Sequence, residues 1–274
     1  MAFLDEILER KRSEIAAAKK LRDLNALKRM IVDAPPLRSF SGALRNGFGL
    51  IAEIKRRSPS GGEMRKENFE RAPAAYAKSP VVKCVSVLTN STDFGMSIKD
   101  LLKMKGQIPK PILRKDFIFE EYQVYEARAF GADALLLMVN VLARDDLRRL
   151  FELSRELGMD VLFEAHTKEE IEAIPEGAKL YGINSRKFKA SAKTFAKSTK
   201  GSDFTVELDT FSLIDSLPKD SLKIAESGVS PSQLSGVLAL GYDAVLVGTS
   251  LLKAESGLDR VLAEFEQAVA VPKV

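Results

Sequence analysis

The regular alternation of short apolar runs with longer helical segments most constrains how this chain folds. From residue 49 onward, eight apolar runs rich in β-branched residues follow one another. They occupy 50–55, 82–88, 111–116, 134–139, 161–165, 179–184, 222–227 and 244–248. The segments between them carry apolar residues at helical spacing, as in 119–132, 144–158 and 230–241. Near-continuous apolar runs of this kind are typical of strands buried on both faces of a parallel sheet.

Eight strand–helix units predict an α/β protein folded as a closed (β/α)8 TIM barrel. A doubly wound open sheet is the structural alternative, but no GxGxxG motif follows any of the apolar runs. No low-complexity linker divides the chain, and 189–203 is its longest loop-like stretch. We therefore expect a single domain over 1–274, in which 49–270 form the barrel.

The residues before the first run predict an extra N-terminal helical segment over 1–45. Apolar residues fall along one side of a first amphipathic helix: Phe3, Leu4, Ile7, Leu8 and Ile15. A second, basic helical stretch covers 21–32 and ends before Pro35 and Pro36. Acidic residues among the first nine positions argue against a signal peptide, and no run approaches 18 apolar residues. We expect a cytoplasmic protein.

The rarest residue types exclude several kinds of site. The chain has one cysteine, Cys84, and one histidine, His166, so an intrachain disulfide, a HExxH zinc site and a three-histidine zinc site are impossible. Cys84 lies in an apolar run and is expected to be a packing residue. His166 shares a strand face with Glu164, but we expect it to be a loop histidine without a catalytic role. The net charge of +4 permits anionic ligands and does not by itself indicate nucleic acid.

Polar and charged residues end most of the apolar runs. They are Glu53, Lys55, Lys115, Asp116, Asn140, Glu164, Asn184, Arg186, Glu226 and Ser227. A structural ion pair explains any single one of them as well as a functional role does, because a buried charge needs a partner. Their recurrence favours an active site, since the carboxyl ends of barrel strands meet at one mouth. Mutual contacts there are expected to shift pKa values.

Glycine- and serine-containing segments follow the last two runs, at 226–228 and 248–250. The loops after strands 7 and 8 form the recurrent phosphate site of this fold. Glycine lets backbone N–H groups approach an anion closely. The position of these segments therefore predicts a phosphate site.

Seven segments together resemble the indole-3-glycerol-phosphate synthase family over nearly the whole chain. They are 51–62, 85–95, 111–139, 163–170, 182–186, 224–229 and 247–252, of which IAEIKRRSPSGG and the stretch from PILRKDFIFEEYQ are the most specific. The resemblance implies a carboxy-lyase of tryptophan biosynthesis. Such an enzyme closes the indole ring of 1-(2-carboxyphenylamino)-1-deoxyribulose 5-phosphate and releases carbon dioxide and water. It implies neither a cofactor nor a metal.

The resemblance also implies catalytic roles. Lys115 matches the general acid for ring closure, and Lys55 matches a second lysine that anchors the anionic substrate and shares the proton work. Glu164 matches the carboxylate of the later proton transfers. Glu53 matches a carboxylate that orients Lys115 and the ligand hydroxyls, and Asn184 matches a residue that hydrogen-bonds the substrate hydroxyls and amine.

Binding roles follow in the same way. Phe94 and Phe117 match aromatic residues that flank the anthranilate ring. Ser58 and Arg186 match residues near its carboxylate, and Glu226 matches a residue that holds the substrate hydroxyls and amine. The implied phosphate cradle consists of Ser227, Gly228, Gly248 and Thr249, with Lys55 as its charge partner.

Three positions depart from the family pattern. The family usually has GINNRDL after the sixth strand, where this chain has Ser185 and Lys187 in GINSRKF. Thr249 stands where the family usually has an acidic residue. None of these changes removes a proton-transfer residue.

Two other functions were weighed. The first is phosphoribosylanthranilate isomerase, whose family uses a cysteine and an aspartate as its acid–base pair. Here the one cysteine, Cys84, lies early in the second run, and the first run carries Glu53 and Lys55 instead. A non-catalytic anion- or nucleic-acid-binding scaffold agrees with the pI of about 9.0 but does not require Glu53, Glu164 and Glu226. We expect a small anionic substrate, no nucleic acid or membrane as partner, and a monomer or homodimer.

Overall fold

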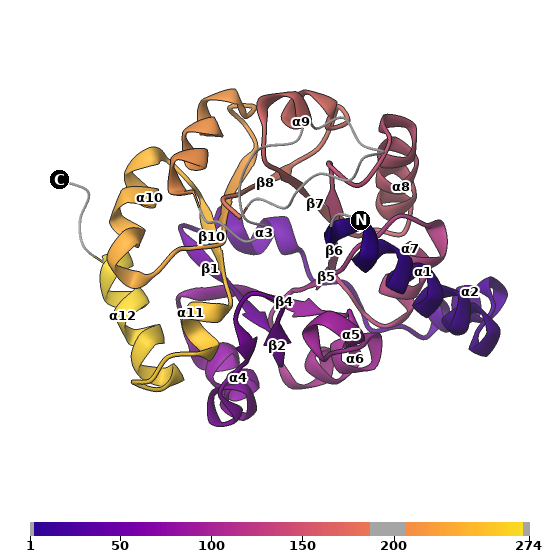
Figure 1. Ribbon diagram of the computed structural model, residues 1–274, viewed down its shortest axis with the longest axis horizontal. Helices are drawn as coiled ribbons and strands as arrows, with labels where there is room; N and C mark the ends of the chain where they lie inside the picture. Colours follow the sequence, from indigo (N-terminus) through magenta and orange to yellow (C-terminus); the bar gives the residue numbers. More distant parts are fainter. Residues whose placement is uncertain (1–2, 187–206, 271–274) are drawn as a thin grey trace.

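The eight apolar runs form eight parallel strands that close into one barrel (Figure 1). The strands are β1 (Gly49–Ile54), β4 (Val82–Leu88), β5 (Ile112–Lys115), β6 (Ala134–Met138), β7 (Asp160–Ala165), β8 (Leu180–Asn184), β9 (Leu222–Glu226) and β10 (Ala244–Val247). Each pairs with the next, and β10 pairs with β1 to close the ring. This computed structural model describes residues 3–186 and 207–270. The predicted (β/α)8 TIM barrel is confirmed.

Helices surround the barrel on the outside (Figure 1). The longer ones are α4 (Lys66–Lys78), α6 (Ile98–Gln107), α7 (Glu121–Ala129), α8 (Arg144–Glu156), α9 (Lys168–Ala173), α10 (Leu234–Leu240) and α12 (Leu258–Ala270). Short helical segments are α5 (Ser91–Phe94), η1 (Leu208–Ser216), η2 (Pro231–Gln233) and α11 (Thr249–Leu252). The segments predicted as helical at 119–132, 144–158 and 230–241 contain α7, α8, and η2 with α10. The predicted loop at 189–203 lies outside the described residues, as does Lys187.

The N-terminal segment contributes three helices: α1 (Phe3–Leu21), α2 (Leu24–Val32) and α3 (Phe40–Arg45). The buried residues Leu4, Ile7 and Leu8 of α1 pack in one cluster with residues of the barrel interior. In the same cluster, Phe40 of α3 lies against Cys84, whose Sγ is 3.7 Å from the Phe40 carbonyl oxygen. The predicted helical extension is confirmed, and Cys84 is the buried packing residue expected.

Along several strands, the residues that face the barrel interior change from apolar to charged toward the carboxyl end. Buried residues of one cluster fill the barrel: Ile51, Leu113, Leu162, Ile224 and Leu246. Two residues further along each strand, on the same face, stand Glu53, Lys115, Glu164, Glu226 and Gly248. The strand sequences therefore build an apolar floor and place charged groups at the carboxyl-terminal mouth. None of the helices described in this chain is long and apolar enough to cross a membrane.

Candidate active site

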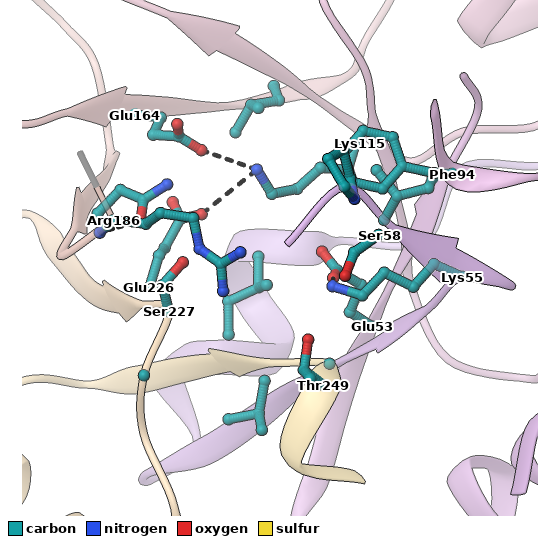
Figure 2. A pocket seen from close by; sticks show the side chains of 18 of the residues that line it. Glu53, Lys55, Ser58, Phe94, Lys115, Glu164, Arg186, Glu226, Ser227 and Thr249 are labelled. Atoms are coloured by element: carbon teal, nitrogen blue, oxygen red, sulfur yellow. Dashed lines mark hydrogen bonds and ion pairs between the residues drawn. The ribbon is translucent and has the colours of Figure 1, made fainter. Parts of the chain in front are cut away.

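A pocket lies at the carboxyl ends of the strands, and every predicted site residue lines it (Figure 2). It contains about 930 Å³ of empty space, its open mouth included. The sequence did not predict that Ile7 of α1, with Leu136 and Met138 of β6, would also line it. No group of three or more His, Cys, Asp or Glu side chains within 3–186 and 207–270 is arranged to hold a metal ion.

Lys115 extends across the pocket toward two carboxylates (Figure 2). Its Nζ lies 2.7 Å from Glu164 Oε2 and 3.6 Å from Glu226 Oε2. Burial disfavours the ammonium, but the negative charges of Glu164, Glu226 and Glu53 outweigh burial and raise the pKa of Lys115 above its usual value. Lys115 is therefore a charged acid at neutral pH, as expected from its carboxylate neighbours.

Glu53 pairs with a different lysine from the one expected. Its Oε1 accepts a hydrogen bond from Lys55 Nζ at 2.6 Å, and both side chains are buried. Lys115 is held by Glu164 instead, so the expectation that Glu53 orients Lys115 was wrong about the direct contact. A Cβ at Gly248 would lie 2.5 Å from Glu53 Oε1, so glycine there leaves room for this pair.

Two buried carboxylates in the pocket have pKa values shifted in opposite directions. For Glu164, burial raises the pKa, but Lys115, His166 and a hydrogen bond from Asn184 lower it to about 2. For Glu226, burial dominates and raises the pKa well above its usual value, with the charge of Glu164 adding to the effect. Neither oxygen of Glu226 has a hydrogen-bond partner in the described part of the chain. Carboxylates tuned apart in this way are typical of acid–base sites.

Gly182 of β8 makes room for Glu226 on the neighbouring strand. A Cβ at Gly182 would overlap Glu226 Oε1 and would come within 3.3 Å of Leu162 Cδ1. Gly182→Ala is therefore expected to displace Glu226 and lower kcat/KM by about 10²-fold, as misplacement of about 1 Å does in an active site. Steady-state kinetics checks this against Gly236→Ala in α10, where a Cβ meets nothing within 4 Å. Equal kinetics for the two variants would show that the Glu226 position is not critical.

A short hairpin brings further predicted binding residues to the pocket. It consists of β2 (Arg57–Ser58) and β3 (Gly62–Glu63), and no apolar pattern in the sequence predicts it. Ser58 is buried there and its Oγ accepts a hydrogen bond from the Gly61 N–H at 3.0 Å. Arg186, which follows β8, donates to Ser60 Oγ of the hairpin. This contact links Arg186 to the hairpin that carries Ser58.

The predicted phosphate residues lie after β9 and β10. Ser227 and Gly228 adopt left-handed φ values of 68° and 71°, and Ser227 is the one non-glycine residue in the described ranges with positive φ. Such strained backbone clusters at ligand sites. Ser185 donates from Oγ to the Ser227 carbonyl oxygen at 3.0 Å, so this departure from the family pattern fixes the strained segment.

Asp116, the other charged residue at the end of β5, belongs to a structural ion network. It accepts from Lys11 of α1 at 2.7 Å and from Arg114 at 3.0 Å, and Arg114 also contacts Glu126 at 2.9 Å. Burial raises the pKa of Asp116, but Lys11 and Arg114 outweigh it and lower this pKa below its usual value. Asp116 is therefore explained by a structural ion pair, the alternative to a functional role that the sequence left open. The network anchors α1 beside the strand that carries Lys115.

The fold is shared with solved structures of low sequence identity. Thiamine phosphate pyrophosphorylase from Pyrococcus furiosus aligns with a TM-score of 0.57 at 16% identity, over 82% of this chain and 97% of that one. 3-Hexulose-6-phosphate synthase from Salmonella typhimurium aligns with a TM-score of 0.57 at 12% identity, over 81% and 98%. At these identities the likeness concerns the barrel alone.

Sequence comparison is more specific. The family model described as indole-3-glycerol phosphate synthase matches residues 4–262. Proteins named indole-3-glycerol phosphate synthase are 39% identical in Rhodococcus jostii (strain RHA1) and 40% identical in Rhodococcus opacus (strain B4), each over 92% of this chain and 90% of the relative. A protein of the same name from Kineococcus radiotolerans is 36% identical over 100% of this chain and 98% of its own. The chain therefore belongs to the indole-3-glycerol phosphate synthase family, the carboxy-lyases of tryptophan biosynthesis.

Proposed function

We propose that this pocket closes the indole ring of 1-(2-carboxyphenylamino)-1-deoxyribulose 5-phosphate with Lys115 as the general acid. The observation that supports this most is the position of the Lys115 ammonium, 2.7 Å from Glu164 and 3.6 Å from Glu226. Its side chain is 15% exposed, whereas those of both glutamates are 1% exposed. Lys115 therefore presents its proton to the pocket while the carboxylates keep it charged.

The lining residues fit the three parts of this substrate. The left-handed backbone at Ser227 and Gly228 is suited to the phosphate, together with Gly248 and Thr249 after the neighbouring strand β10. Arg186 is suited to the anthranilate carboxylate, because a guanidinium binds a carboxylate through two parallel hydrogen bonds. Phe94 and Phe117 line the pocket and offer apolar faces to the anthranilate ring.

The first chemical step joins two carbons of the substrate. The aromatic carbon that bears the carboxylate attacks the substrate carbonyl, and Lys115 protonates the carbonyl oxygen as negative charge develops there. Carbon dioxide then leaves, and its bonding electron pair is taken up by the ring and its positively charged nitrogen. Lys115 ends this stage with one proton fewer.

The last step removes water from the former carbonyl carbon. Glu164, ionised in the pocket because its pKa is lowered to about 2, takes a proton from the neighbouring carbon, which bears the nitrogen. The electron pair of that C–H bond forms the ring double bond as the C–O bond breaks. Because Lys115 has already given up its proton, a different ammonium group protonates the departing hydroxyl. Lys55, buried beside Glu53 at 2.6 Å, is a second ammonium in the pocket besides Lys115 and also anchors the anionic substrate. One proton is removed and one is supplied, so water leaves without net proton transfer.

The isomerase alternative receives no support from the position of Cys84. This thiol lies in β4 against α3, is not among the pocket-lining residues, and has its pKa raised by burial. It therefore supplies no acid to the pocket.

The direct test of the proposed reaction is to add the carboxyphenylamino-deoxyribulose phosphate and follow indole fluorescence. The chain contains no tryptophan, so the protein itself contributes no indole emission. We expect emission to rise with time and to be absent when substrate or protein is omitted. Substrate that stays unchanged with folded protein would contradict the proposal.

Glu226→Gln is expected to raise stability while impairing binding. A carboxyl group whose pKa is higher in the folded than in the unfolded state costs stability at every pH above its unfolded pKa. Replacing it with a neutral amide should raise the free energy of unfolding at pH 7 by about 1 kcal/mol, the scale of a typical stabilising substitution. The gain should shrink toward pH 4, where the carboxyl is increasingly protonated in both states. KM should rise, because a substrate contact is lost.

Urea unfolding at both pH values measures this effect. Glu176→Gln, at an exposed position, serves as the control and should leave stability unchanged. A lower stability of Glu226→Gln at pH 7 would mean that the Glu226 charge is favourably paired.

A further inference from the structure

The single histidine of the chain lies between two carboxylates, one of which, Glu164, lines the pocket. His166 follows β7 directly, and its side chain is 7% exposed. Nδ1 lies 3.2 Å from Glu170 Oε2, and Nε2 lies 3.7 Å from Glu164 Oε1. The steps proposed above leave this buried titratable group without a role, although it touches the carboxylate assigned to the last of them.

Glu170 fixes the orientation of the imidazole. It belongs to the first turn of α9, and its Oε2 also accepts the backbone N–H of His166 at 2.7 Å. The ring therefore presents an Nδ1–H to Glu170 and directs Nε2 toward Glu164. Glu164 in turn contacts Lys115 through its other oxygen, Oε2, at 2.7 Å. The carboxylate proposed as the base is thus flanked by two nitrogen groups, one at each oxygen.

The Nε2 atom shows which charge state suits this arrangement. It is buried without a hydrogen-bond partner in residues 3–186 and 207–270. In a neutral ring with its proton on Nδ1, Nε2 is an acceptor and would face an ionised carboxylate, which is also an acceptor. A proton on Nε2 turns this unfavourable contact into a charge-assisted one.

The charged groups around the ring favour that proton. Glu164 faces it from its own strand, Glu170 from α9, and Lys115 from β5. Burial disfavours the imidazolium and Lys115 repels it, but the two carboxylates outweigh both and raise the pKa of His166 above its usual value. The electrostatics and the geometry therefore agree.

On the basis of the proposed role of Glu164, we propose that His166 is a positioning residue. In its protonated form, the imidazolium, it holds the Glu164 carboxylate in place. Lys115 neutralises Glu164 at one oxygen in the resting pocket. When Lys115 gives its proton to the substrate carbonyl, that positive charge is lost. The imidazolium at the other oxygen then keeps Glu164 ionised, so it does not compete for the proton intended for substrate and remains free to accept the later one.

Nuclear magnetic resonance of the free protein tests the charge state directly. Because His166 is the only histidine, ¹⁵N-labelled protein gives one imidazole spectrum without assignment. We expect both ring nitrogens to carry protons at pH 6.5, the ordinary midpoint, and the titration to occur above it. Glu164→Gln and Glu170→Gln should each lower the midpoint. A midpoint at or below 6.5 in the wild-type protein would overturn the proposal.

Two substitutions of His166 distinguish the contributions of Nδ1 and Nε2 to kcat. The Asn side chain of His166→Asn keeps a donor near Nδ1 for Glu170 and offers Glu164 nothing. The Gln side chain of His166→Gln places an uncharged N–H near Nε2. We expect kcat to fall about 10-fold in His166→Asn and less in His166→Gln, with KM nearly unchanged, which is below the ~10²-fold loss of a direct acid or base. The ionisation of kcat/KM that matches the NMR midpoint of the free wild-type protein should be absent from both variants.

Glu172→Gln, at an exposed position of the same helix α9, is the matched control and should behave as wild type. Unchanged kcat and pH profile in both histidine variants would overturn the proposal, as would a change confined to KM. Circular dichroism confirms folding, and His166→Gln together with the NMR titration decides the matter if His166→Asn does not fold. Undiminished turnover by Glu164→Gln would refute the proposed base itself, a result distinct from these.

Discussion

Lys115→Met is expected to lower kcat by about 10³- to 10⁴-fold, the upper part of the range for loss of a general acid. The methionine side chain fills the space but carries no proton for the substrate carbonyl and no charge for the developing oxyanion. The Lys115 ammonium is also the group that touches both Glu164 and Glu226. Indole fluorescence over long incubation measures the residual rate, and near-wild-type turnover would contradict the assignment.

The fold should survive this change. The loss of the ammonium leaves three carboxylates near one another, Glu164, Glu226 and Glu53. Without the ammonium, the pKa of Glu164 rises and protonation relieves the repulsion. We expect substrate affinity to change little, since this substitution leaves the groups proposed to bind phosphate and carboxylate in place. Lys103→Met, at an exposed position on α6, controls for the loss of a lysine and should retain full activity.

Glu164→Gln is expected to lower kcat by at least about 10²-fold and to stop the reaction at a later point. Glutamine keeps the shape of the side chain but takes no proton, so ring closure and decarboxylation should proceed while water elimination fails. With one carboxylate fewer, the pKa of Lys115 falls, because Glu164 is the largest contributor to its rise after the opposing effect of burial.

Single-turnover measurements of both products separate the two variants. Glu164→Gln should release carbon dioxide much faster than it forms indole, whereas Lys115→Met should release neither. Parallel loss of carbon dioxide and indole in Glu164→Gln would place this residue in ring closure. A mild effect on both would shift the later proton transfers to Glu53, another carboxylate that lines the pocket.

The pocket residues could be predicted because strand periodicity is local. Lys115 stands two residues after the interior residue Leu113, and Glu164 two residues after Leu162. Once the eight strands are recognised, the two-residue spacing predicts that both side chains lie at the carboxyl-terminal mouth of the barrel. The same logic fails for partner choice: Glu53 and Lys115 both reach the mouth, yet Glu53 bonds Lys55.

Contacts between distant segments could not be predicted. The apolar stripe of the first helix shows that Ile7 is buried, but not that it lines the pocket. Lys11 lies in a charged stretch of the first helix, where exposure to solvent is the usual outcome, yet its side chain is 2% exposed beside Asp116. From the sequence, His166 is expected to be a loop residue without a catalytic role. Its contact with Glu170 could not be predicted, because that contact depends on where α9 begins. In each case the deciding partner comes from another element.

The ion pair between Lys11 and Asp116 also bears on how the chain is synthesised. Its two residues are 105 positions apart. At about 5–20 residues per second, the ribosome needs about 5–20 s to make the intervening segment. During this interval Leu4, Ile7 and Leu8 lack the β5 and β6 residues against which they pack. Helix α1 therefore finds its place only after β5 and β6 have been made, and its apolar face is a point of contact for chaperones during translation.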